Sequence, residues 1–256
     1  MGNIFFGVVP LIERNLRAWR PYALVYFLRM VEVPMHLYVL GFGLAMLGGL
    51  FAPGQSYGAF VLPGLIVWSL WLAVIIESTY TTFVRAFTYR LWQGVLMTPV
   101  RLPAILIAEQ VVGAIKGLLL MLLAYPFALW FGAIPSHGGF LLAFIPALLL
   151  VMVITAMGHL MTSLARSEFD FDIVWPIYAT PMFLASGIMF PRERLPGWLQ
   201  AVGEFFPLTH AIEAMRPLML GDWQAASVAW HCLMLTVMWA GFSFASYYFF
   251  RRRLYE

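Results

Sequence analysis

Three ionisable residues lie within apolar stretches of the sequence and are the first candidates for chemistry. Glu77 stands near the end of one apolar run, and Glu109 and Lys116 stand within the next. A charge near the centre of a bilayer costs about 2.5 to 3.5 kcal/mol on insertion scales and seldom faces lipid. Lys116 therefore needs a partner. Glu109, seven residues earlier on roughly the same helical face, is too far for a direct pair but could share a polar seam, and Glu77 is the other candidate.

Two roles stay open for Lys116: an ion pair that locks helices together, or guidance of an anionic headgroup. A second group of candidates lies in the proline-rich stretch between Pro181 and Gly221, where charged and aromatic residues could cap and pair helices or form a gate. The gate candidates are Glu204, Phe205, Phe206, Pro207, His210, Glu213 and Arg216.

Catalytic motifs are missing from the sequence. Lys116 is the only lysine and follows Ile115, so no P-loop is present, and the five histidines form no H-E-x-x-H pattern. The partial match to a nucleophile elbow, GFSFA from Gly241 to Ala245, lies in an apolar run, where small residues let helices pack closely. Cys232 is the only cysteine, which excludes an intrachain disulfide and a cysteine-built metal site. We expect no catalytic residue, no metal site and no cofactor in this chain.

The composition is that of a polytopic membrane protein. Hydrophobic residues make up 62% of the chain, charged residues only 11%, and the mean hydropathy is +0.86. A soluble domain of this composition could not cover its exterior with polar side chains. The formal charge of +3 forms no basic patch, so nucleic acid is not an expected partner.

The apolar runs predict an all-α protein with six transmembrane helices. Pro10 to Arg20 should form an amphipathic helix on the membrane surface, with Ile12, Leu16 and Trp19 on one face. The expected spans are 33–50, 58–79, 103–127, 140–164, a fifth beginning near Phe171, and 226–250. Aromatic residues near span ends should be mainly interfacial anchors. They are Trp68, Trp71, Tyr80, Trp130, Trp175, Trp198 and Tyr247.

The stretch from Pro181 to Gly221 should not span the membrane. Its apolar pieces are too short, and prolines at 191, 196, 207 and 217 interrupt any continuous helix. Broken backbone inside a membrane is tolerated only where protein or water satisfies its polar groups. We therefore expect short re-entrant helices packed on full spans at one membrane face.

The arginines predict the orientation. With six spans, eleven arginines face one side and three face the other, and the positive-inside rule makes the first side cytoplasmic. The cytoplasmic set is Arg14, Arg17, Arg20, Arg29, Arg85, Arg90, Arg101, Arg166, Arg251, Arg252 and Arg253, against Arg192, Arg194 and Arg216. Both termini should then be cytoplasmic and the broken stretch external.

The order of these elements, and three local sequences, resemble the membrane subunits of ABC-2 type ABC exporters. The sequences are RNLRAW (14–19), FLASGIMFP (183–191) and FFPLTHAIEAMRPLMLG (205–221), and they are most similar to the lipo-oligosaccharide or nodulation-factor exporter permeases. The resemblance implies one ABC-2 domain over 1–256, with an N-terminal interfacial region (1–28), a coupling segment (85–100) and external re-entrant helices (190–221).

The resemblance also implies that the coupling segment contacts an ATPase subunit. A helix from about 89 to 97, ended by Thr98-Pro99, would present an apolar face that needs covering outside the bilayer. The implied contact residues are Arg90, Leu91, Trp92, Gln93, Val95, Leu96, Thr98 and Pro99. The family often carries an acid where Gln93 stands, which leaves an ion pair to the ATPase open. A helix that only lies on lipid headgroups is the alternative.

The resemblance implies a homodimer in the bacterial cytoplasmic membrane, bound to two ATPase subunits that hold the ATP and magnesium. Its substrate would be an amphipathic lipid-linked oligosaccharide or polysaccharide-type molecule, moved outward, and membrane lipid would be a further partner. Two alternatives stay open: a hydrophobic drug exporter of the same fold, and an intramembrane enzyme acting on a lipid carrier. The missing catalytic motifs weigh against the enzyme.

Overall fold

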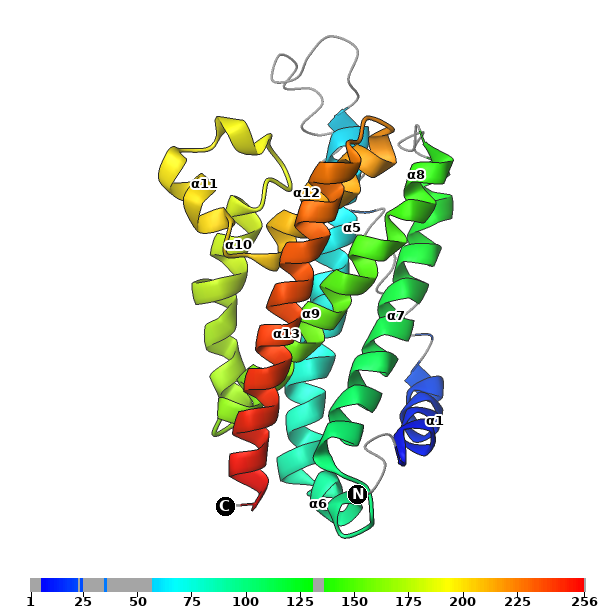
Figure 1. The fold of residues 1–256 in the computed structure, drawn as a ribbon, viewed down its shortest axis with the longest axis vertical. Coiled ribbons are helices and arrows are strands. Elements are labelled where there is room, and N and C mark those ends of the chain that lie inside the picture. The colour runs from blue at the N-terminus through cyan, green and yellow to red at the C-terminus, as the bar shows by residue number, and fades with distance from the viewer. Residues whose placement is uncertain (1–5, 23, 25–34, 36–56, 131–135, 256) are drawn as a thin grey trace.

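The computed structural model describes residues 6–22, 24, 35, 57–130 and 136–255 (Figure 1). Over these ranges the chain is helical and contains no strand. The predicted first span, 33–50, falls outside the described residues except for Met35.

Four helical segments in the described ranges are long and apolar enough to cross a membrane: Tyr57–Thr88, Leu102–Pro126, His137–Leu164 and Ala225–Tyr255. The first comprises α5 (Tyr57–Ile76) and two π-helical turns, Glu77–Thr81 and Val84–Thr88. The second belongs to α7 (Leu102–Trp130), the third joins α8 (His137–Leu142) to α9 (Phe144–Leu164), and the fourth is α13 (Ala225–Tyr255). They agree with the second, third, fourth and sixth predicted spans.

The predicted surface helix is α1 (Val8–Trp19), followed by a 3-10 turn at Arg20–Tyr22. It packs beside α7 (Figure 1). Leu11 and Asn15 are its buried residues, whereas the ion pair between Arg17 and Glu13 is exposed. The helix is therefore amphipathic as predicted, but its buried stripe contains a polar side chain.

Glycines bring α7 and α9 into close contact. A Cβ atom at Gly117 would lie 2.4 Å from Cγ2 of Val151, and one at Gly113 would lie 2.7 Å from Oγ1 of Thr155. The spacing of these glycines is that of the G-x-x-x-G motif, in which small residues let two membrane helices approach. Lys116 stands beside this seam.

An aromatic cluster joins α5 to the fifth helical segment. Trp71 is fully buried, stacks on Trp68 at 4.9 Å and meets the edge of Trp175 at 5.4 Å. The assignment of these tryptophans as interfacial anchors is therefore wrong for Trp71, because its ring fills the space between the two segments. Trp198, by contrast, is exposed.

The fifth segment is short and changes helix type along its length. It runs as a 3-10 helix (Glu168–Ile173), a π-helical turn (Trp175–Ala179) and α10 (Thr180–Ala185). A capping box opens it, in which Asp170 accepts hydrogen bonds from the backbone N–H of Arg166 and from the Ser167 hydroxyl and N–H. These bonds, the one from the Arg166 backbone above all, hold the pKa of Asp170 below its usual value.

The broken stretch forms a 3-10 turn (Arg192–Arg194), α11 (Gly197–Gly203) and α12 (Pro207–Leu220). The expected breaks at Pro191, Pro196 and Pro207 are confirmed, but the break at Pro217 is wrong. Pro217 lacks the N–H that would bond the Glu213 carbonyl, yet α12 continues because it packs on α5, α9 and α13. It ends at Gly221, whose φ of 86° is suited to a residue without Cβ.

A side chain of α13 provides hydrogen-bond donors for the backbone carbonyls at the C-terminal end of α9. Nη1 of Arg253 donates to the carbonyls of Thr162, Ser163 and Ala165, and its guanidinium lies 3.7 Å from the ring centroid of Phe87. The terminal carbonyls of a helix have no partner within the helix, so an arginine from another element can cap them. Arg253 thus ties α13 to α9 at the end of the bundle that also carries α6 (Leu91–Leu96) (Figure 1).

Two adjacent glycines give a matched test of the packing between α8 and α12. A Cβ at Gly139 would lie 1.7 Å from the backbone oxygen of Leu218, whereas one at Gly138 would meet nothing within 4 Å. We predict that Gly139→Ala lowers the free energy of unfolding by about 1 to 3 kcal/mol or more, since backbone must move. Gly138→Ala should leave it unchanged or slightly raised. Thermal unfolding of both variants in detergent is the measurement, and equal midpoints would contradict the assigned contact.

Candidate functional site

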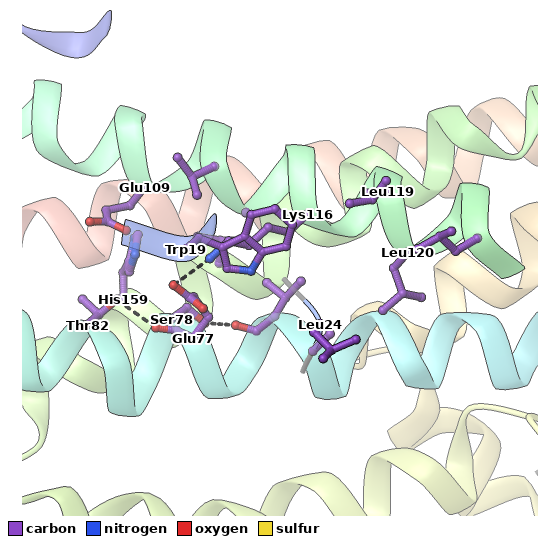
Figure 2. A pocket seen from close by; sticks show the side chains of 16 residues that line it. Trp19, Leu24, Glu77, Ser78, Thr82, Glu109, Lys116, Leu119, Leu120 and His159 are labelled. Carbon is purple, nitrogen blue, oxygen red and sulfur yellow. Dashed lines mark hydrogen bonds and ion pairs between the residues drawn. The ribbon is translucent and has the colours of Figure 1, made fainter. Parts of the chain in front are cut away.

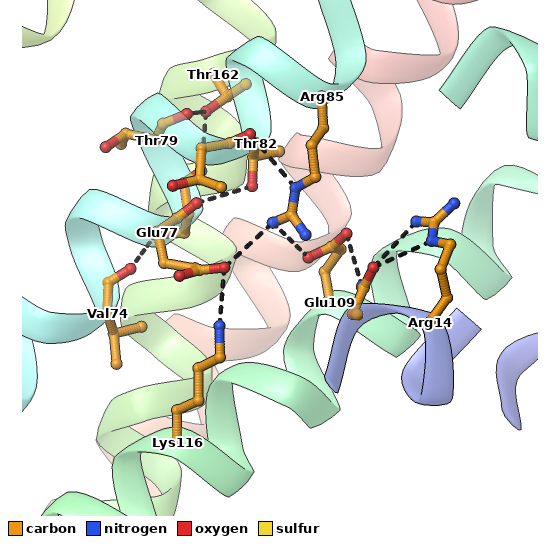
Figure 3. Close-up of polar contacts among 12 residues, drawn as sticks. Arg14, Val74, Glu77, Thr79, Thr82, Arg85, Glu109, Lys116 and Thr162 are labelled. Carbon is orange, nitrogen blue, oxygen red and sulfur yellow. Dashed lines mark hydrogen bonds and ion pairs between the residues drawn. The ribbon is translucent and has the colours of Figure 1, made fainter. Parts of the chain in front are cut away.

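The three ionisable residues singled out in the sequence, Glu77, Glu109 and Lys116, meet in one cluster with Arg14, Asn15 and Arg85, which we call the charge cluster (Figure 3). Lys116 Nζ lies 2.9 Å from Oε1 of Glu77. Nη2 of Arg85 donates to Oε2 of Glu109 at 3.0 Å and lies 3.5 Å from Oε1 of Glu77. Of the two partners proposed for Lys116, Glu77 therefore makes the direct pair and Glu109 is joined through Arg85.

The amphipathic helix takes part in the charge cluster. Asn15 Nδ2 donates to Oε1 of Glu109 at 3.0 Å, and Arg14 donates to Oδ1 of Asn15. The Lys116 ammonium also lies 5.5 Å from the ring centroid of Trp19. These contacts explain the buried Asn15: it links α1 to a carboxylate on α7.

The π-helical turns carry the acid and the arginine that bridge the cluster. Glu77 opens one turn and Arg85 lies in the next, where the N–H of Tyr89 bonds the Val84 carbonyl five residues back. Such insertions change the angular register of a helix and are frequent at functional sites. Nothing in the residue pattern predicts them, so the sequence could not place Arg85 in the cluster.

A cavity of about 420 Å³ adjoins the charge cluster (Figure 2). The described residues that line it come from α1, Leu24, α5 with its first π turn, α7 and α9. They are Trp19, Leu24, Ala73, Val74, Glu77, Ser78, Thr82, Glu109, Val112, Gly113, Lys116, Leu119, Leu120, Leu123, Thr155 and His159. In Figure 2 the labelled polar residues Glu109, Thr82 and His159 gather toward one end, and Leu119 and Leu120 toward the other. The cavity is thus amphipathic.

The coupling segment folds as a short helix, α6, shorter than predicted. Arg90 precedes it with a left-handed φ of 53°, and the Thr98 hydroxyl donates to the Val95 carbonyl near its end. Leu91 and Met97 are exposed, 48% and 88% respectively, and Gln93 is exposed between them. Thr98 and Pro99 are exposed as well. The segment therefore presents an apolar surface beyond the ends of the spans (Figure 1).

Trp92 is a correction to the predicted contact set. It is fully buried in its own chain, where its ring lies 4.9 Å from that of Phe250 and 6.4 Å from that of His159. Val95 and Leu96 pack partly on the same cluster. The short helix turns its largest apolar side chain inward, so Trp92 anchors α6 and Leu91 and Met97 form its outer surface.

The gate candidates divide into anchored and exposed residues. Arg216 donates to the carbonyls of Phe60, Gly187 and Ile188, with its guanidinium 3.9 Å from the ring centroid of Phe60. Phe206 and Pro207 are buried, and Glu213 is partly exposed. Phe205, at 78%, is exposed. Arg216 fixes α12 to α5 and to the turn that follows α10.

His210 and Glu204 hold the loop between α11 and α12. His210 Nε2 lies 2.9 Å from the Glu204 carbonyl oxygen, and His210 Nδ1 lies 3.1 Å from Nδ1 of His231 on α13. The Glu204 carboxylate pairs with Arg192. These contacts serve capping and pairing, which are the structural roles left open by the sequence.

The amino-acid sequence that forms the charge cluster, the cavity and α6 matches a known family. The sequence profile of the ABC-2 type transporter family matches residues 10–220, most of the chain. The chain therefore belongs to the ABC-2 type transporter family, as the local sequences predicted.

Individual relatives cover most of the chain. Nodulation protein J of Rhizobium meliloti (strain 1021) is 32% identical over 217 residues, 82% of this chain and 80% of that protein. Nodulation protein J of Sinorhizobium fredii (strain NBRC 101917 / NGR234) is 32% identical over 251 residues, 94% and 92% of the two chains. The probable multidrug ABC transporter permease YbhR of Escherichia coli (strain K12) is 25% identical over 203 residues, 79% of this chain and 55% of that protein.

Family and fold together define the class. The protein is a membrane-spanning permease of an ABC exporter in a bacterial membrane, and permeases of this family work with ABC ATPase subunits. Permeases of this family are transport subunits.

The charge cluster allows a test of the pair between Glu77 and Lys116. Glu77→Gln leaves the ammonium without its carboxylate in a poorly hydrated site, which we expect to cost about 3 to 5 kcal/mol of unfolding free energy. The double variant Glu77→Gln with Lys116→Met removes the stranded charge and should recover part of that loss. Glu13→Gln, which breaks the exposed pair with Arg17, is the control and should cost about 0 to 1 kcal/mol. Denaturant titration in mixed micelles measures all three, and similar losses for Glu77→Gln and Glu13→Gln would contradict the role of the cluster.

Proposed function

We propose that this permease exports an amphipathic lipid-linked oligosaccharide or a related polysaccharide-type molecule. The observation that carries the proposal is the amphipathic cavity between the spans, whose polar end adjoins the charge cluster and whose other end is leucine-lined. A molecule with a sugar head and an apolar chain matches both ends. The names of the relatives from Rhizobium and Sinorhizobium support an exporter of the nodulation-factor type.

A hydrophobic drug exporter is the second candidate, and one observation favours it. The relative YbhR is named a probable multidrug permease, and it matches 79% of this chain. A purely apolar drug, however, would offer no hydrogen bond to His159 at the polar end of the cavity, whose ring nitrogens have no partner among the described residues, and unpaired buried polar groups are costly. We therefore rank this candidate second.

Transport in vesicles separates the two candidates. The permease and its ATPase would be reconstituted together, and ATP-dependent movement of a sugar-labelled acylated oligosaccharide would be compared with that of an apolar dye. We expect the acylated oligosaccharide to move only when both subunits and ATP are present. Transport of the dye alone would favour the drug exporter, and chemical conversion of the lipid without the ATPase would favour an enzyme.

We propose that the permease lies in the bacterial cytoplasmic membrane and crosses it with six spans. Both termini are then cytoplasmic, and the stretch 190–221 is external. Two observations support this orientation: α1, α6 and the end of α13 lie toward one end of the bundle, and α8, α11 and the end of α12 lie toward the other (Figure 1). The first end carries most of the arginines.

Single cysteines at Gln93 and His137, both exposed, test this orientation in a Cys232→Ser background. Impermeant reagent should label position 137 in intact cells and position 93 only after lysis, and the reverse pattern would overturn the orientation.

We propose that the permease works as a homodimer and that the exposed surface of α6, formed by Leu91, Gln93 and Met97, docks on one of two ATPase chains that carry ATP and magnesium. An exposed apolar surface beyond the membrane needs a cover. Trp92 supports a mechanical role, because it joins α6 to Phe250 of α13 and His159 of α9, so a push on α6 reaches two spans.

We propose further that the gate at the outer mouth lies in 192–205 rather than in α12. Arg216 anchors α12, whereas Trp198 and Phe205 are exposed.

A disulfide between cysteines placed at position 198 of the two protomers, in the Cys232→Ser background, tests this gate. In the vesicle assay the cross-linked permease should stop exporting while basal ATP hydrolysis continues. Export at full rate under complete cross-linking would make the stretch a static cap.

Met97 provides the test of docking. Met97→Asp adds a charge to a desolvated contact, which we expect to weaken ATPase binding by about 2 kcal/mol or more. Because Met97 is exposed, the permease itself should fold normally. Phe205→Asp, an equally exposed apolar position at the opposite end of the molecule, is the control and should bind the ATPase as the wild type does. Co-purification and titration measure the affinity, and normal binding by Met97→Asp would remove α6 from the docking surface.

A further inference from the structure

His159 is a buried polar side chain in the cavity lining that receives no hydrogen bond from the described residues. His159 is 1% exposed, lines the cavity from α9, and neither of its ring nitrogens has a hydrogen-bond partner in the part of the chain that the structure describes. Leaving a buried polar group unpaired is costly, so each such group needs an explanation. The rings of Trp92 and Phe250 cover His159 on other sides.

Lys116, which lines the cavity, and its neighbour Arg85 already have carboxylate partners. Lys116 is paired with Glu77 at 2.9 Å, and Arg85 with Glu109 at 3.0 Å. An anionic headgroup would have to displace a carboxylate from one of these cations. A neutral group would need only to bond His159. The cavity therefore favours a neutral polar group over the anionic headgroup that the sequence left open for Lys116.

The chemistry of the missing partner follows from the imidazole. A neutral histidine offers one donor and one acceptor, and hydroxyl and amide groups offer the same pair in return. The opposite end of the cavity, where Leu119 and Leu120 lie, suits an alkyl chain (Figure 2), and Leu123 of the same helix also lines the cavity. A cavity of about 420 Å³ is in the range of small-molecule sites, about 300 to 1,000 Å³. It can hold a head and the adjoining chain but not a whole oligosaccharide.

We propose that this cavity binds a neutral amphiphile, with its hydroxyl- or amide-bearing head bonded to His159 and its alkyl chain against Leu119, Leu120 and Leu123. The proposal rests on the proposed function, since it assigns a binding site for the acylated end of the exported molecule. It adds a specificity-determining residue, His159, which the sequence analysis did not single out because a lone histidine in an apolar run has no motif.

Photolabelling of the permease alone tests the site. The protein in phosphatidylcholine nanodiscs would be exposed to decyl glucoside carrying a diazirine in its chain, with the equivalent diazirine decanoate as an anionic probe of equal length. We expect saturable labelling of 119–123 by the glucoside, competed by unlabelled decyl glucoside and at least fivefold tighter than labelling by the carboxylate. Mass spectrometry locates the label. Equal or tighter labelling by the carboxylate, or labelling that does not saturate, would overturn the proposal.

Two variants of His159 separate binding from folding. His159→Phe keeps a ring and removes both nitrogens, so the thermal midpoint of the empty protein should hold or rise while glucoside affinity falls at least fivefold. His159→Gln keeps a donor and an acceptor and should retain most of the affinity. His137→Phe, an exposed histidine outside the cavity lining, is the control and should label normally. Unchanged glucoside affinity in His159→Phe would mean that water alone satisfies His159 and would overturn the proposal.

The vesicle assay distinguishes this proposal from the proposed function. Saturable, His159-dependent labelling without export of the acylated oligosaccharide would uphold the site and reject the substrate class. Export at the wild-type rate by His159→Phe, together with absent labelling, would reject the site and uphold the function.

Discussion

Mutual neutralisation of buried charges is the constraint on which this structure depends. An ammonium or carboxylate within membrane spans is stable only beside its counterion, so Lys116, Glu77, Arg85 and Glu109 fix how α5 and α7 sit against each other. Asn15 extends the same requirement to α1. The amphipathic helix is thereby docked on α7 by a polar contact in addition to its apolar stripe, and it forms one wall of the cavity through Trp19.

Hydropathy predicted the long helices well because apolar runs of span length have few alternative folds. Side-chain direction was harder to predict. Trp92 was assigned to the outer surface of α6 and is buried, because a six-residue helix has too few residues to reveal its buried face. Pro217 was read as a break, but neighbouring helices hold α12 through it. The sequence offered two acids as partners of Lys116. Arg85 was read as a marker of orientation and as the start of the coupling segment, but not as a member of the cluster, since π-helical turns leave no trace in the residue pattern.

The cavity and the coupling helix α6, which the sequence analysis treated separately, are in contact through aromatic side chains. His159 lines the cavity and also lies against Trp92 of α6. Phe250 of α13 lies against both rings. Well-packed aromatic rings leave little free volume, so they move together rather than singly. A change of shape at either place therefore has a short, packed route to the other, without a long chain of intermediate residues.

Arg253 has a consequence for how the protein is made. The carbonyls at the end of α9 receive their donor from a residue that is synthesised some ninety positions later, judged from the sequence separation of 88 to 91 residues. Until the last helix leaves the ribosome, that end of α9 must rely on water or on other chains at the membrane surface. The bundle is therefore closed at this end by a helix that is made long after α9, and synthesis of α13 becomes a condition for a finished α9.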